Sequence, residues 1–243
     1  MSEDRSEAED RSSHVAGTSV LLFLHEVGDA DGPRRWRALG TGASGPGGQH
    51  RWPGAVLVPD LPGHGVVPPE EGAYYAPGDV ALVGVRALAA AGLDGEAPVV
   101  GGHGWGAFGA ELLAAAGRAS ALVLVDGLGG PWVSRSQLID VQHAWLRVVL
   151  ADPAALAPPP PGALDPRLRH GFPSVWERAF TEARRAAITV PVLALESPTS
   201  PTPPAERAER VEAFGGHARV EEIAEASPQA VLAALSAWSR AQL

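Results

Sequence analysis

The chain has 243 residues, enough for one sizeable α/β domain with its own core, and its 45% apolar content is typical of a globular protein. Its formal net charge of −9 argues against nucleic acid and anionic membrane surfaces as partners. The sequence contains neither Cys nor Lys, which excludes disulfides, thiolate catalysis, Cys-ligated zinc and a lysine Schiff base.

The segment 1–18 is polar and acidic, and we expect it to be a disordered tail. It lacks the apolar core of a secretory signal. No apolar stretch elsewhere is long enough to span a bilayer. These features together predict a soluble, cytoplasmic protein.

From residue 20 onwards, short apolar runs alternate with helical patterns. Strands are predicted at 20–24, 55–59, 98–101, 121–125, 190–195 and 219–223, and helices at 77–91, 105–116 and 228–243. This alternation is the signature of βαβ units and predicts an α/β fold with a mostly parallel central sheet flanked by helices. In such a sheet, functional loops lie beyond the carboxyl ends of the strands.

One segment, 131–187, interrupts the alternation. It contains a run of four prolines and two helical stretches, at 137–150 and 175–186. We therefore expect a lid or cap inserted into a core that is formed by 19–130 and 188–243.

The central motif is Gly102-His103-Gly104-Trp105-Gly106, which follows a predicted strand and opens a predicted helix. Other motifs surround it in a specific order: VLLFL followed by His25, DLPGHG at 60–65, ALVLVDG at 121–127 and VPVLAL at 190–195. In this order and spacing the chain resembles the α/β-hydrolase fold family from about residue 18 to its end. The resemblance implies that the central motif is the nucleophile elbow of that family.

Departures from the family pattern affect all three members of the catalytic triad. The nucleophile position holds Gly104, which has no side chain. The loop that usually carries the acid, 196–201, has no Asp, and the loop that usually carries the histidine, 224–228, has no His. His217 precedes its strand and is expected at the wrong end of the sheet. Loss of all three argues against an engineered Gly104 and against an ordinary serine hydrolase.

The resemblance also identifies groups that survive around the pocket. In the related hydroxynitrile lyases the residue matching Glu26 is polar and points at the substrate, which makes Glu26 the candidate acid or base. A carboxyl in an apolar site can have a raised pKa and act in this way. The alternative is that Glu26 bonds to a loop amide or pairs with Arg34 or Arg35.

The oxyanion hole of the family is formed by backbone N–H groups, which here belong to the residues Val27 and Trp105. Loss of the serine does not remove these donors, so the hole can still bind a carbonyl or carboxylate oxygen. The alternative is that the vacant elbow holds only water.

Weaker candidates complete the site. His25 and Asp126 are possible catalytic groups, although bracing the oxyanion loop and shaping a turn are the alternative roles. His143, three residues after Asp140, could face the pocket from the lid or lie in solvent. Aromatic residues of the insertion either line the pocket or pack the lid onto the core: Trp132, Trp145, Phe172 and Trp176.

Three functions remain open on the sequence, and whether the protein is an enzyme stays undecided among them. The first is triad-independent acid–base catalysis of lyase, isomerase or cyclase type on a small carbonyl compound. The second is a non-catalytic binding or scaffold role, and the third is hydrolysis of an ester or lactone by a directly activated water. No cofactor and no metal are expected, since no credible ligand spacing or phosphate loop occurs. A small molecule is the expected partner, with the oligomeric state undetermined.

Overall fold

The computed structural model describes residues 20–45, 48–65, 67, 75–157 and 163–242. The acidic tail predicted at 1–18 lies outside this range. Within the range, no helix is both long and apolar enough to cross a bilayer.

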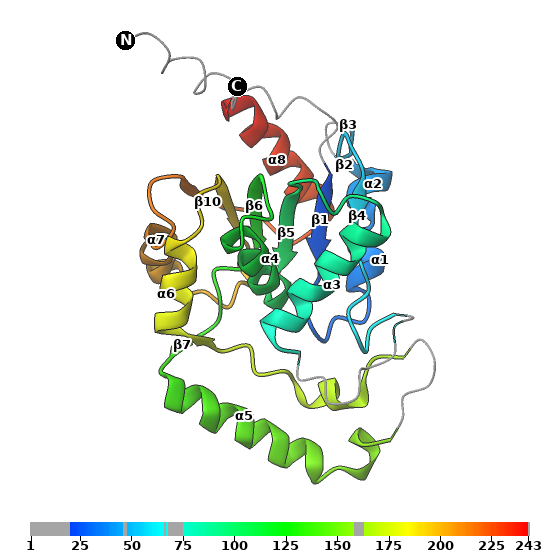
Figure 1. Cartoon of the computed structure of the whole chain (residues 1–243), viewed down its shortest axis with the longest axis vertical. Helices are drawn as coiled ribbons and strands as arrows, with labels where there is room; N and C mark the ends of the chain where they lie inside the picture. The colour runs from blue at the N-terminus through cyan, green and yellow to red at the C-terminus, as the bar shows by residue number, and fades with distance from the viewer. Residues whose placement is uncertain (1–19, 46–47, 66, 68–74, 158–162, 243) are drawn as a thin grey trace.

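The core is a six-stranded parallel sheet with the strand order β10-β9-β6-β5-β1-β4 (Figure 1). Its strands are β1 (Leu21–Leu24), β4 (Val56–Leu57), β5 (Val99–His103), β6 (Ala121–Val125), β9 (Val192–Glu196) and β10 (Ala218–Glu222). Each lies within a residue or two of a predicted strand, and the predicted parallel α/β architecture is confirmed. Because all six strands run in the same direction, the loops that follow β1, β5, β6 and β9 meet at one edge of the sheet.

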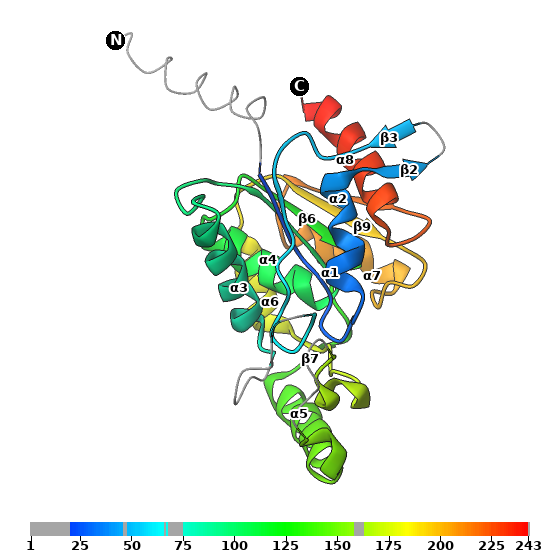
Figure 2. The same ribbon diagram turned by 90° about the vertical axis from the view of Figure 1, so that its right-hand side faces the viewer.

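Helices cover both faces of this sheet (Figure 2). One face packs against α3 (Pro77–Ala90), α4 (Trp105–Ala115) and α6 (Arg178–Ala186), and the other against α1 (Gly32–Trp36), α2 (Ala38–Thr41) and α8 (Pro228–Gln242). Alternate residues of β1 enter the two cores, Leu22 and Leu24 on the first side and Leu21 and Phe23 on the second. Burial on both faces explains why the strands are continuous apolar runs.

Several short elements were not expected from the sequence, among them α1, α2, β2, β3 and α7. A short antiparallel pair, β2 (Ala43–Gly45) and β3 (Gly48–His50), lies in a glycine-rich stretch with little pattern. A further helix, α7 (Pro204–Glu212), lies beside β10 and follows a proline-rich loop.

After β6 the chain leaves the central sheet, and it returns to the sheet at β9. The segment in between contains β7 (Trp132–Val133), α5 (Arg135–Leu150), two short 3-10 segments, η2 (Pro153–Ala155) and η3 (Pro166–His170), and β8 (Trp176–Glu177). α5 projects from the body of the protein, as Figure 1 shows. The predicted second lid helix corresponds to α6, which packs against α4 and thus belongs to the helical layer of the core. The assignment of 131–187 as a lid stays a prediction.

A buried ionic cluster joins α6 to α4. The Glu111 carboxylate, with no exposed surface, accepts hydrogen bonds from Arg184 Nε at 2.8 Å and from Arg185 Nε at 3.0 Å and Nη2 at 2.8 Å. Arg185 Nη2 also donates to the carbonyl oxygen of Leu128 at 3.1 Å. Two buried guanidinium groups thus depend on one carboxylate, and the cluster fixes the chain just after β6.

Glu111→Ala should therefore destabilise the fold strongly, by about 3 to 5 kcal/mol, because it leaves two buried cations without their partner. Glu182→Ala is the matched control, since Glu182 pairs with Arg178 on the surface and should contribute less than about 1 kcal/mol. Urea denaturation of the three proteins measures both effects. Equal losses in the two variants would contradict the role given to Glu111.

Candidate functional site

The turn between β5 and α4 has the shape of a nucleophile elbow. Gly104 adopts φ +53° and ψ −117°, which is a conformation that side chains rarely tolerate. Gly106 follows at a position where a Cβ would overlap the carbonyl oxygen of Leu24 on the neighbouring strand. The close approach of β1 and α4 therefore requires the glycine at 106. The elbow is intact, although the residue at its tip carries no side chain.

The carboxyl group of Glu26 fills the space that a side chain at position 104 would need. A Cβ built on Gly104 would overlap Glu26 Oε2. The same oxygen accepts a hydrogen bond from the backbone N–H of Trp105 at 2.6 Å, and the backbone N–H of Val27 also bonds to the carboxyl. Both expected oxyanion-hole donors are thus engaged by a carboxyl that enters from the loop after β1.

Burial is the main influence on the acidity of Glu26. It raises the pKa of Glu26 to about 8, with small further increases from Asp29 and Asp126. Hydrogen bonds from the Trp105 and Val27 amides oppose this rise because they stabilise the charged form. Neither Arg34 nor Arg35 neutralises Glu26, since they pair with Asp31 and Asp29. Glu26 is therefore mainly protonated at pH 7 and can both donate and accept a proton near neutrality.

Two buried histidines brace the loop that carries Glu26. His25 Nδ1 donates to the carbonyl oxygen of Glu26 at 2.9 Å, while His25 Nε2 accepts from the N–H of Leu61 at 3.2 Å. His64 Nε2 accepts from the N–H of Gly28 at 2.8 Å. Burial lowers the pKa of His25 to about 4 and also lowers the pKa of His64. Both rings are thus neutral at pH 7, and their nitrogens are engaged in holding the loop.

Asp126 lies at the end of β6 and connects it to the loop after β9. Its two carboxylate oxygens accept hydrogen bonds from the backbone N–H of Ser197 at 2.6 Å and from Ser197 Oγ at 2.7 Å. Its φ of +47° places it in the left-handed region, which asparagine and aspartate tolerate better than most residues. Asp126 also borders the cavity described next, so its carboxylate adds negative charge there.

A third buried carboxyl, that of Glu196, lies close by and was not predicted from the sequence. Glu196 Oε1 accepts from the N–H of Leu128 at 3.1 Å, and Ser200 Oγ donates to Glu196 Oε2. Burial raises the pKa of Glu196. The signal was present in the sequence, since Glu196 ends the strand that the family's acid usually follows. Its hydrogen bonds tie together two loops at the sheet edge.

A cavity of about 190 Å³ lies over the elbow. It is lined by Glu26, Gly104, Trp105, Asp126, Gly129, Gly130, Ser174, Trp176 and Pro201. The only ionisable side chains among these residues are the two carboxyls, and no histidine is present. The cavity is therefore small and acidic, with aromatic and glycine walls, and it lacks the base that would activate a serine.

The other predicted site residues fall into two groups. Trp176 borders the cavity, whereas Trp145 and Phe172 contact each other in the segment between β6 and α6, with ring centroids 5.8 Å apart. The rings of Phe172 and Trp105 are also in contact, with centroids 5.2 Å apart, so aromatic packing joins this segment to the start of α4. His143 is exposed on α5 and lies outside the cavity lining.

Trp132 and His217 do not line the cavity either. Trp132 lines a neighbouring groove. His217 bonds through Nε2 to the carbonyl oxygen of Ile188 at 2.8 Å, just before β10 begins, which is the opposite end of the sheet from the elbow. The expectation that His217 lies far from the site agrees with this placement.

Comparison with solved structures places the fold among the α/β hydrolases. A hypothetical protein from Pseudomonas aeruginosa PAO1 has 21% identity and a TM-score of 0.64, covering 92% of this chain and 91% of that one. A thermophilic esterase from Thermogutta terrifontis has 19% identity and a TM-score of 0.56, covering 92% and 90%. An α/β hydrolase from Sphaerobacter thermophilus has 19% identity and a TM-score of 0.54, covering 91% and 92%.

These likenesses show the α/β-hydrolase fold. No family model matches the chain, and no curated protein matches it by sequence. The specific chemistry therefore has to be argued from the site itself.

The overlap between position 104 and Glu26 predicts strong energetic coupling. Gly104→Ala should destabilise the protein more than Gly117→Ala, a control with φ +70° and nothing near the added methyl group. Adding Glu26→Ala should relieve the excess, giving a coupling energy of about 1 to 3 kcal/mol in a double-mutant cycle. Urea denaturation measures each term. Additive effects of the two substitutions would show that the carboxyl does not occupy the elbow.

The raised pKa of Glu26 predicts a pH-dependent stability. Because its folded pKa of about 8 exceeds the ordinary value of 4.5, its contribution is complete below pH 4.5 and is lost as the pH rises through 8. Glu26→Gln does not titrate, so its stability relative to the native protein should increase by about 4 kcal/mol between pH 5 and pH 9. The exposed variant Glu225→Gln is the control. A pH-independent difference would rule out the raised pKa.

Proposed function

We propose that this protein is a triad-independent acid–base enzyme that acts on a small carbonyl-containing molecule, with Glu26 as its catalytic residue. Lyase, isomerase and cyclase reactions are the types that such a site suits. The observation that supports the proposal best is the position of the Glu26 carboxyl, at the tip of the elbow and facing a cavity.

The acidity of Glu26 fits this role. A catalytic acid or base works best when its pKa lies near the working pH, and burial raises the pKa of Glu26 to about 8. Below this pH the protonated carboxyl can donate to a substrate oxygen, and the carboxylate that remains can remove a proton from a neighbouring atom. The amides of Trp105 and Val27 hold the carboxyl in place and stabilise its charged form.

The cavity suits a small substrate. The walls formed by Trp105 and Trp176 are apolar, so they strengthen electrostatic interactions with the reacting group. Asp126 faces the same space with its carboxylate held by Ser197, so it can orient a hydroxyl group of the substrate. Among the cavity-lining residues no histidine is available, which favours Glu26 as the proton-transferring group.

A second candidate function is non-catalytic binding. One observation favours it: both amides that would hold the oxygen of a reacting carbonyl are already bonded to Glu26. In this version the carboxyl plugs the oxyanion hole, and the cavity retains a ligand without converting it. The two candidates differ in the expected effect of replacing the Glu26 carboxyl. An enzyme should lose turnover, whereas a binding protein should change only in its affinity for the ligand.

Proton abstraction from 5-nitrobenzisoxazole, followed by ring opening, offers a direct assay of a carboxylate base, alongside a panel of small hydroxynitriles, ketones, esters and lactones. Turnover should survive fluorophosphonate treatment, should fall about 100-fold or more in Glu26→Gln, and should be partly restored in Glu26→Asp. For the proton abstraction, kcat/KM should rise with pH to an inflection near 8, the raised pKa of Glu26.

Glu225→Gln, an exposed carboxylate outside the cavity lining, is the control and should leave all rates unchanged. Equal turnover in the native protein and in Glu26→Gln would contradict the proposal. Ligand binding without turnover in any variant would favour the second candidate. Turnover blocked by the fluorophosphonate would indicate a serine nucleophile elsewhere.

A further inference from the structure

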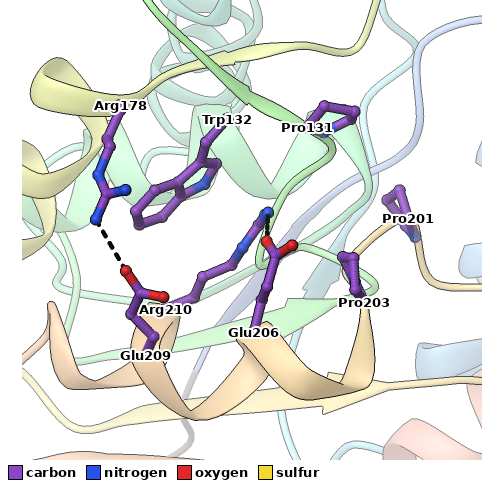
Figure 3. Close-up of a pocket in the computed structure, with 8 residues that line it drawn as sticks. All are labelled: Pro131, Trp132, Arg178, Pro201, Pro203, Glu206, Glu209 and Arg210. Atoms are coloured by element: carbon purple, nitrogen blue, oxygen red, sulfur yellow. Dashed lines mark hydrogen bonds and ion pairs between the residues drawn. The ribbon is translucent and has the colours of Figure 1, made fainter.

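A groove of about 580 Å³ lies next to the cavity and takes no part in the role assigned to Glu26. We call it the Trp132 groove. Its lining residues are Pro131, Trp132, Arg178, Pro201, Pro203, Glu206, Glu209 and Arg210 (Figure 3). Two glutamates and Arg210 rise from α7 and Arg178 begins α6, while Pro131 and Trp132 come from the segment after β6.

The groove combines rigid apolar walls with balanced charge. Its three prolines are exposed, and the indole of Trp132 lies beside Arg178 and Arg210. Arg178 Nη2 bonds to Glu209 Oε1 at 2.8 Å, and Arg210 Nη2 bonds to Glu206 Oε2 at 2.5 Å. The two cations and two anions cancel, so the groove carries no net charge.

Hydrogen-bonding capacity remains in the groove. Over the described part of the chain, the second carboxylate oxygens of Glu206 and Glu209 accept no hydrogen bond, and these side chains are 48% and 59% exposed. The indole N–H of Trp132 is buried and has no acceptor there. A buried donor without a partner is costly, so a ligand oxygen at this point would stabilise the site. The groove therefore offers exposed acceptor oxygens next to a buried donor that lacks a partner.

The groove and the cavity over Glu26 are parts of one surface. Pro201 lines both, and the consecutive residues Gly130 and Pro131 line the cavity and the groove, respectively. Arg210 Nη1 donates to the carbonyl oxygens of Gly129 at 2.6 Å and Gly130 at 2.8 Å. The guanidinium of Arg210 thus holds a wall of the cavity with one nitrogen and closes an ion pair in the groove with the other.

Size also favours a joint site. Pockets that bury a drug-sized ligand usually have volumes of roughly 300 to 1,000 Å³. The cavity, at about 190 Å³, is below this range, and the groove, at about 580 Å³, is within it. A molecule that reacts in the cavity and exceeds its volume can extend past Pro201 into the groove.

We propose that the Trp132 groove binds the non-reacting part of the substrate, and that this part is an uncharged chain that carries amide groups. The inference rests on the proposed function, because the reacting group is placed at Glu26. Amide N–H groups match the unused oxygens of Glu206 and Glu209, and amide carbonyls match the donors of Arg178 and Trp132. A tail with a net charge would have to disrupt an existing ion pair to find a partner.

Three small molecules test this chemistry: neutral acetylglycylglycine amide, the anion acetylglycylglycine and the cation glycylglycine amide. NMR titration should shift the indole N–H signal of Trp132, assigned with Trp132→Phe. We expect the neutral ligand to bind in the millimolar range and each charged analogue about fivefold or more weakly, which corresponds to one lost hydrogen bond or about 1 kcal/mol.

Matched variants locate the binding. Glu209→Gln and Trp132→Leu should each weaken binding of the neutral ligand about fivefold. Glu182→Gln should not, although Glu182 also bonds to Arg178, because it does not line the groove. No shift of the Trp132 signal, equal affinity in Glu209→Gln, or tighter binding of a charged analogue would overturn the proposal.

Glu26→Gln separates this proposal from the one that it rests on. The variant should bind acetylglycylglycine amide as the native protein does, because Glu26 does not line the groove. Ligand binding together with turnover that is insensitive to Glu26→Gln would refute only the catalytic role of Glu26. Loss of turnover in Glu26→Gln without any ligand binding would refute only the groove.

Discussion

The arrangement of the site depends on the contact between the Glu26 carboxyl and the amides at the start of α4. In a nucleophile elbow these amides face the oxygen that becomes charged during catalysis. Here they face an internal carboxyl, which occupies the volume of the missing side chain at position 104. A side chain at position 104 and this carboxyl exclude each other in space, so the glycine at 104 and the placement of Glu26 depend on each other.

Charge in the site is organised by burial and not by ion pairs. Glu26, Asp126 and Glu196 approach the same sheet edge, and none of them forms a salt bridge in the described structure. Two buried cations lie instead between α6 and α4, where Arg184 and Arg185 bond to Glu111. This separation leaves Glu26 without a neutralising partner, so its pKa rises. A cation placed beside it would keep it ionised and remove its capacity to donate a proton at neutral pH.

The sequence predicted the sheet well because its strands are buried on both faces and read as continuous apolar runs. It also located the elbow, since the glycine at 106 is required by close packing against β1. The sequence could not predict the position of the Glu26 side chain, because that position depends on how two loops far apart in the chain meet. The glutamate after His25 and the glycine at 104 were both visible in the sequence, but only the fold shows that the carboxyl lies against the glycine.

Arg210 extends this logic from the cavity to the groove. Two sets of acceptors stabilise its buried guanidinium. Nη2 bonds to Glu206, while Nη1 donates to the carbonyl oxygens of Leu128, Gly129 and Gly130. Carbonyl dipoles and a partly exposed carboxylate share the stabilisation of one charge, so a change on either side alters the other. A group that engages Glu206 in the groove thereby acts on the same cation that positions the glycine wall facing Glu26. Under the two proposals, binding of a substrate tail in the groove and the shape of the cavity over Glu26 are linked through Arg210.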